Sequence, residues 1–261
     1  MKSLSSLLIT SAVIAVSATA SAALVAGDIA LVSFQASGTP SDSFSFATLV
    51  NVDAGTVLYF TDNGFTTGSG FRGVLSTDND GNEGVIKYTV GASGLAAGQI
   101  VSSLSTNTAN GTWTLSGLIF TSGSGSFAPL NFSASGEQLT VLTSTNSQPL
   151  LSGYTALYNF DNTGAYEAST SSSTGQLVTG LVAGTSAVLL GSPLNANFAN
   201  FNFGAFSGSA DRDTWLARMG NSANWTTSVA TTNTSDGSFN IPAPGAAALL
   251  GLAGLIARRR R

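Results

Sequence analysis

Short runs of β-branched and aromatic residues, separated by turns rich in Gly, Ser and Asn, dominate the chain. In the run 43–52, Phe44 and Phe46 fall on one face of a strand and serines fall on the other. Only 211–220 is a helix candidate. The expected strands are 29–34, 43–52, 56–62, 85–90, 138–143, 154–160 and 186–191. This pattern predicts an all-β fold, a β-sandwich, with a jelly roll or another β-barrel as the alternative.

An Ala-Gly pair stands before several of these runs, at Gly27, Gly55, Gly98 and Gly184. Glycine tolerates positive φ and therefore permits a tight turn that leads into a strand. The spacing between these glycines is uneven, which does not fit a solenoid repeat. We interpret the pairs as the same turn chemistry used several times.

The first residues have the pattern of a secretory signal peptide. Met1-Lys2 gives a positive start, 7–18 is apolar, and Ala20-Ser21-Ala22 is an A-x-A cleavage pattern. We therefore expect a signal peptide at 1–22 and a mature chain beginning near Ala23. The rest divides into a β-sandwich domain at 23–230, a polar linker at 231–240 and a C-terminal signal at 241–261.

The composition of the body excludes several classes of function. Charged residues make up 8% of the chain and hydrophobic residues 43%. Outside the two ends, the only basic residues are Arg72, Lys87, Arg212 and Arg218, against 13 acidic residues, so we expect no nucleic-acid partner. The chain has no Cys and no His, which excludes Ser-His-Asp and Cys-His catalysis and histidine-bound zinc.

The C-terminal tail is apolar from 245 to 257 and ends in four arginines. As a helix this stretch would be about 20 Å long, whereas a bilayer core is about 30 Å thick. The arginines would stay on the cytoplasmic side and the body outside. We therefore expect an apolar C-terminal helix that associates with the inner membrane transiently.

The tail resembles the PEP-CTERM sorting signal of exported bacterial proteins. The likeness rests on three parts in order, namely Pro242-Ala243-Pro244, the apolar helix and the cluster Arg258, Arg259, Arg260 and Arg261. The resemblance implies recognition by exosortase, a membrane-embedded cysteine protease that cuts near the proline motif. This sequence departs from the family at Ala243, where Glu is usual, which bears on the variant of exosortase that reads it.

The body is similar to a β-rich module of secreted and surface bacterial proteins, with some likeness to lamin-tail-like sandwiches. The segments that carry this resemblance are 43–65, 136–144 and 223–228. It implies an interaction module and no particular site residue.

One acidic loop is a candidate Ca²⁺ site. Asp78, Asp80, Asn82 and Glu83 surround Gly81, and alternating oxygen ligands with a glycine suit calcium. The full EF-hand pattern is absent, so a solvated acidic turn is the alternative interpretation. Asp62-Asn63-Gly64, at the end of an expected strand, could also contribute to a ligand or calcium site. Ordinary turn chemistry is the alternative interpretation there. We expect no other cofactor.

Catalysis by this chain would depend on carboxylates, and no spacing among them is diagnostic of a glycosidase pair. We expect the Asp211–Asp213 segment to form a local ion pair at a helix start. The phenylalanines of 195–206 could stack on sugars, although core packing is the commoner role of such rows. The other acidic candidates are Glu83, Glu137, Asp161 and Glu167.

The sequence therefore predicts an exported, non-enzymatic structural or adhesive protein of the cell surface or extracellular matrix. An exosortase-type membrane protease is its expected processing partner, and extracellular polysaccharide is a candidate ligand. A calcium-assisted carbohydrate-binding module is one alternative. A carboxylate-based polysaccharide hydrolase is the other.

Overall fold

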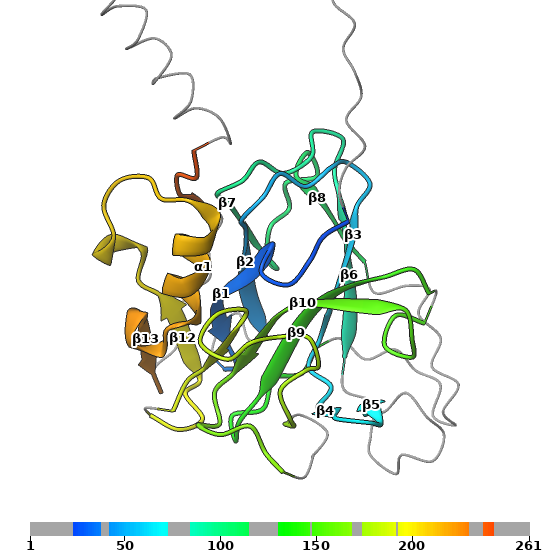
Figure 1. Cartoon of the computed structure of the whole chain (residues 1–261), viewed down its shortest axis with the longest axis vertical. Coiled ribbons are helices and arrows are strands. Elements are labelled where there is room, and N and C mark those ends of the chain that lie inside the picture. The colour runs from blue at the N-terminus through cyan, green and yellow to red at the C-terminus, as the bar shows by residue number, and fades with distance from the viewer. Residues whose placement is uncertain are drawn as a thin grey trace, which may run out of the picture.

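The computed structural model describes residues 23–37, 42–72, 84–114, 130–146, 148–168, 174–191, 193–229 and 237–242. Its architecture is built on two six-stranded sheets (Figure 1). The all-β prediction is confirmed. Each expected strand overlaps an observed one, and the run 85–90 matches its strand at both ends.

The first sheet has the order β13-β12-β1-β2-β7-β14 and is antiparallel throughout. Its strands are β1 (Ile29–Gln35), β2 (Ser43–Thr48), β7 (Gln99–Ser102), β12 (Phe198–Phe201), β13 (Trp225–Ser228) and β14 (Gly237–Ser238).

The second sheet has the order β11-β10-β9-β3-β6-β8, and only its β10–β11 pair is parallel within the described residues. A separate hairpin pairs β4 (Phe65–Thr66) with β5 (Gly70–Phe71). The strands of the second sheet are β3 (Val57–Thr61), β6 (Val85–Val90), β8 (Gly111–Thr114), β9 (Gln138–Ser144), β10 (Tyr154–Asp161) and β11 (Ala187–Leu189).

The main hydrophobic core lies between the two sheets. Phe44 and Phe46 of β2 both contact Phe60 of β3, with ring centroids 4.9 and 5.2 Å apart. Phe34 of β1 stacks on Phe160 of β10 at 4.8 Å. The two phenylalanines of β2 thus share the inward face, as alternation along a strand predicts.

A second, smaller core covers the other face of the second sheet. Tyr59 is buried there, although its strand neighbour Phe60 faces the main core. The covering residues come from the β4–β5 hairpin and from connections on either side of β10, and they are Phe65, Phe71, Leu150, Val178 and Leu181. The second sheet is therefore buried on both faces over part of its area.

Helix α1 (Arg212–Gly220) packs against β1 and β11, between the short 3₁₀ turns η1 (Phe203–Ala205) and η2 (Ser222–Asn224). Asp211 caps it, accepting a hydrogen bond from the Thr214 backbone N–H at 2.7 Å. The expected local ion pair is present between Arg212 and Asp213 at 2.7 Å. Arg212 also pairs with Asp28 at 2.8 Å, which ties the helix to the start of β1.

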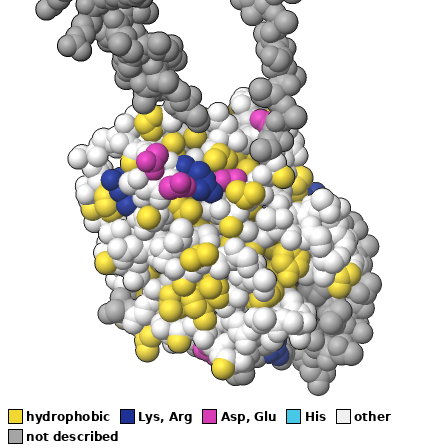
Figure 2. All heavy atoms as spheres, in the orientation of Figure 1, with side chains coloured by type: hydrophobic (Ala, Val, Ile, Leu, Met, Phe, Trp, Pro, Cys, Tyr) yellow, Lys and Arg dark blue, Asp and Glu magenta, His cyan; other side chains and the backbone are white. Residues whose placement is uncertain are grey.

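The described surface carries few charges. Figure 2 shows one face on which charged side chains gather mainly in one band and hydrophobic side chains are scattered among uncharged polar atoms. Within the described ranges, no helix has the length and apolarity needed to cross a membrane. The predicted C-terminal apolar helix lies outside those ranges.

Candidate functional site

Most residues of the sequence-predicted sites lie outside the described residues. These are the calcium-loop residues Asp78, Asp80, Asn82 and Glu83, the cleavage residues Ala20 and Ala22, and the tail residues Ala243, Pro244, Arg258, Arg259, Arg260 and Arg261. Among the residues that the structure does describe, no group of three or more Asp, Glu, His or Cys is placed to hold a metal.

Pro242 is the one residue of the sorting motif that the structure describes, and it follows a segment that packs on the body. We call residues 237–242 the C-terminal strap. Its first residues form β14, with Gly237 opposite Ile100 of β7. Directly after the strand, the Phe239 N–H donates to the Gly98 carbonyl at 2.7 Å. The strap therefore adds an edge to the first sheet.

Trp215 of α1 holds the strap from the other side. Its ring lies 4.7 Å from the Phe239 ring, centroid to centroid, and its Nε1–H donates to the Asn240 carbonyl at 3.1 Å. Ile241 is half-buried against the main core, whereas Pro242 is exposed. Packing of the strap thus ends at Ile241, directly before Pro242. Residues 237–240, expected as the end of a linker, pack on the body.

The Asp62-Asn63-Gly64 segment has a structural role at the end of β3. Asp62 and Asn63 are buried. Asp62 Oδ2 accepts a hydrogen bond from the Asn131 backbone N–H at 2.9 Å, and the Asn63 amide donates to Thr61 Oγ1 at 2.7 Å. The Asp62 bond joins β3 to the segment that leads into β9, and the Asn63 bond fixes the turn itself.

The remaining carboxylate candidates divide into structural and exposed groups. Glu137 is buried, and its two oxygens accept hydrogen bonds from the backbone N–H groups of Ser133 (2.7 Å) and Gln138 (3.1 Å). Asp211 and Asp213 serve the start of α1. Glu167 is exposed. This arrangement uses Glu137 as a loop anchor, which leaves it unsuited to proton transfer.

The aromatic row at 195–206 belongs largely to the core. Phe198 and Phe201 are buried, with 8% and 1% of their surface exposed. Phe206 is half-buried, stacks on Phe201 at 5.6 Å, and lies 4.6 Å from the Arg218 guanidinium. These contacts favour packing over sugar stacking as the role of the row.

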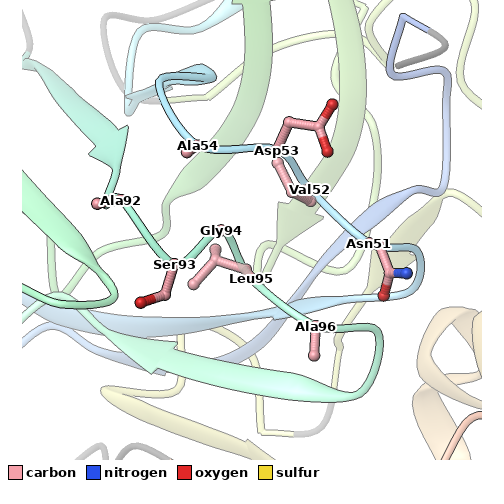
Figure 3. A pocket seen from close by; sticks show the side chains of 9 residues that line it. All are labelled: Asn51, Val52, Asp53, Ala54, Ala92, Ser93, Gly94, Leu95 and Ala96. Atoms are coloured by element: carbon pink, nitrogen blue, oxygen red, sulfur yellow. The ribbon is translucent and has the colours of Figure 1, made fainter. Parts of the chain in front are cut away.

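A surface hollow of about 600 Å³ lies between two turns, 51–54 and 92–96 (Figure 3). The turns are joined by reciprocal backbone hydrogen bonds of 2.8 Å between Val52 and Leu95. The side-chain oxygen of Asn51 is already engaged within the protein, because it accepts a hydrogen bond from the Ala97 N–H at 2.9 Å. The hollow offers the Asp53 carboxylate and the Ser93 hydroxyl, which is too little for acid–base or nucleophilic chemistry.

A row of buried polar side chains lies at the end of β10. Asn159 and Asp161 are fully buried and sit opposite Thr140 and Gln138 of β9. The Asn159 amide donates to Thr140 Oγ1 at 2.9 Å. Asp161 Oδ1 accepts from the N–H and the hydroxyl of Thr163 at 2.8 and 2.6 Å.

The other oxygens of this row have no hydrogen-bond partner among the described residues. They are Asn159 Oδ1, Asp161 Oδ2 and the Tyr166 hydroxyl. Burial raises the pKa of Asp161 to about 6. Sequence reasoning named Asp161 among scattered carboxylates but missed Asn159 and Tyr166, since neither belongs to a motif.

Comparison with known proteins gives no match, whether to protein-family models, to curated proteins or to solved structures. The resemblance of the tail to PEP-CTERM signals therefore stays a prediction.

Proposed function

We propose that the chain is an exported bacterial protein of the cell surface or extracellular matrix, with a structural or adhesive role, sorted through its tail by an exosortase-type protease. The observation that carries the proposal is the junction at Ile241 and Pro242. Packing on the body ends at half-buried Ile241, and the exposed Pro242 begins the Pro-Ala-Pro motif. The N-terminal pattern at 1–22 supports export.

The position of this junction suits proteolytic processing. A protease needs an unpacked stretch of chain, and exposed segments outside packed elements are the preferred sites of cleavage. A cut after Pro242 would leave β14 and the Trp215–Phe239 contact in place. The body would keep its sheet while losing the apolar tail and its arginines.

The chemistry of the body supports a non-enzymatic role. The chain has no His and no Cys, and Glu137 is engaged by backbone N–H groups. We assign the two-sheet body to the β-sandwich class in preference to a jelly roll or other barrel. Sandwiches serve widely as surface and interaction domains, which is an argument by analogy of fold.

The sorting proposal predicts the mass of the mature protein. When the chain is produced in a host that encodes an exosortase, protein recovered from the surface or medium should lack Arg258–Arg261. Replacing Pro242 and Pro244 together by Ala should leave the tail attached and the protein with the inner membrane. Intact mass spectrometry of both fractions measures this.

A matched variant, Ala243→Glu, restores the residue that the family usually carries and should be processed at least as well as the natural chain. Recovery of natural-sequence surface protein with its four arginines intact would contradict the sorting proposal. So would processing that is unaffected in the double proline variant.

A further inference from the structure

A second hollow, of about 340 Å³, is lined by residues of both sheets. Asp42 directly precedes β2, and Ser103 and Leu104 directly follow β7, so the first sheet supplies one wall. Ile86 of β6 and Trp113 of β8 supply the opposite wall from the second sheet. The hollow therefore lies at one end of the gap between the sheets, where the main core meets the surface.

The floor of this hollow is apolar and includes a fixed aromatic ring. Ile86 and Trp113 are half-buried against the main core, and Leu130 belongs to that core. The Trp113 ring lies 4.7 Å from the Tyr88 ring, centroid to centroid, and its Nε1–H donates to the Ser102 carbonyl at 3.2 Å. These contacts hold the ring in place while part of it stays exposed, which gives a ligand a prearranged apolar surface.

One hydrogen-bond acceptor and one donor stand beside this floor. Asp42 Oδ1 accepts from the Phe132 N–H at 2.9 Å, and Ser103 Oγ accepts from the Phe44 N–H at 3.0 Å. Both side chains are thus anchored to backbone. Within the described chain, Asp42 Oδ2 and the Ser103 hydroxyl proton have no partner. A carboxylate oxygen and a hydroxyl proton therefore remain for a ligand.

We propose that this hollow binds one residue of a neutral polysaccharide, with the apolar face of the sugar on Trp113 and its hydroxyls on Asp42 and Ser103. Sugar rings carry C–H faces that suit the negative face of an aromatic ring. Their hydroxyls both donate and accept, and the bond to a carboxylate is charge-assisted. The volume is at the lower end of the roughly 300–1,000 Å³ of small-molecule sites, which suits a single sugar residue.

The lining favours an uncharged sugar over other small ligands. No Lys or Arg is among the described residues of the hollow, so an anionic sugar would meet the Asp42 carboxylate without a cation to offset it. A simple ammonium ion would suit Asp42 and Trp113 but offers no acceptor to Ser103. The described lining of the larger hollow in Figure 3 includes no aromatic side chain.

This inference deepens the adhesive role proposed above and rests on it for the source of the polysaccharide. Binding by the purified full chain requires neither export nor removal of the tail. Sugar binding and tail processing can therefore succeed or fail separately, and the two measurements distinguish them.

Electrophoresis of the full chain through gels that contain a soluble β-glucan, a galactan or a mannan tests the proposal. We expect at least one of the three to retard the chain, with a Kd below about 1 mM. Asp42→Asn should weaken that binding at least about tenfold, because it keeps an oxygen for the Phe132 N–H and replaces the other oxygen by a nitrogen donor. Asp53→Asn, in the larger hollow, should bind like the natural chain.

The Asp42→Asn variant should fold normally. Asp42 has a φ of +55°, in the left-handed region that Asn tolerates as well as Asp. Its Tm should therefore stay within about 3 °C of that of the natural chain, so that a loss of binding reports on the site.

Tryptophan fluorescence gives a second measurement. Trp215 and Trp225 are buried, whereas Trp113 is half-buried and lines the hollow. Bound polysaccharide should therefore protect Trp113 from quenching by acrylamide, and Trp113→Phe should lose this protection.

The proposal is overturned if none of the three polysaccharides retards the chain. It is equally overturned if Asp42→Asn binds as tightly as the natural chain, if Asp53→Asn weakens binding as much, or if the protection from acrylamide persists in Trp113→Phe.

Discussion

At the scale of single residues, Gly98 shows why an Ala-Gly turn is needed at its position. Its φ is +89°, and a Cβ there would lie 2.0 Å from the Phe239 carbonyl oxygen. Positive φ was predictable from the sequence, because the Ala-Gly pair precedes a strand. The close approach of the strap was not, since Phe239 is distant in sequence and reaches Gly98 only in the folded chain.

Gly98→Ala should destabilise the protein more than Gly55→Ala, which is its matched control. Gly55 has a similar φ of +81°, but a Cβ added there would have no neighbouring atom within 4 Å. We expect Gly55→Ala to cost about 1–2 kcal/mol for the left-handed backbone alone. Gly98→Ala should cost about 3 kcal/mol or more. Equal losses in urea unfolding would show that the strap does not press on Gly98.

At the scale of elements, the sequence predicts strands well where the hydrophobic pattern is strong. β6 has the predicted bounds because Val85, Tyr88 and Val90 mark its buried positions. β14 was missed, since Gly237 and Ser238 have no strand propensity and are ordered by pairing with β7. Partner-dependent elements of this kind leave no local signal.

The second core was hidden from sequence reasoning for a related reason. Gln138 and Thr140 of β9 alternate with apolar residues, which is typical of a face open to water. Both are fully buried in the structure. The Gln138 side chain is hydrogen-bonded to the segments that cover this face. Its oxygen accepts from the Phe65 N–H and its nitrogen donates to the Gln176 carbonyl, each at 3.1 Å. The burial of Asn159 and Asp161, and the unpartnered hydroxyl of Tyr166, could therefore be recognised only in the folded structure.

Helix α1 offers a test of its cap with a defined pH dependence. Hydrogen bonds from Thr214 lower the pKa of Asp211. Because the pKa is lower in the folded state, the ionised cap stabilises the fold at pH values above the pKa of the unfolded chain. This contribution is lost as the pH falls through the pKa of the folded state. Asp211→Ala should lower the Tm by about 2–4 °C at about pH 7. The difference should shrink at about pH 2.

Asp213→Ala is the comparison variant, because it removes an exposed ion pair and leaves the cap in place. Its Tm should change less than that of Asp211→Ala, since exposed pairs contribute little. A loss in Asp211→Ala that is the same at both pH values would argue against a charged cap.

At the scale of the whole molecule, the strap decides how much of the C-terminus the fold requires. A chain ending at Pro242 retains β14 and the Trp215 contacts, so its Tm should match that of the full chain. A chain ending at Asp236 loses both and leaves β7 as an open edge. We expect its Tm to fall by about 5 °C or more, with increased aggregation in light scattering. Equal Tm values for the two truncations would contradict this.

If the chain is exported as proposed, the position of β14 has a consequence for the order of events. Gly237 pairs with Ile100, a residue that crosses the membrane much earlier in a chain threaded from its N-terminus. The first sheet can be completed only after residues 237–241 have emerged. In the proposed pathway, the same moment brings the Pro-Ala-Pro motif to the outer face of the membrane that holds the protease. Emergence of the last strand of the first sheet and exposure of the cleavage site would then coincide.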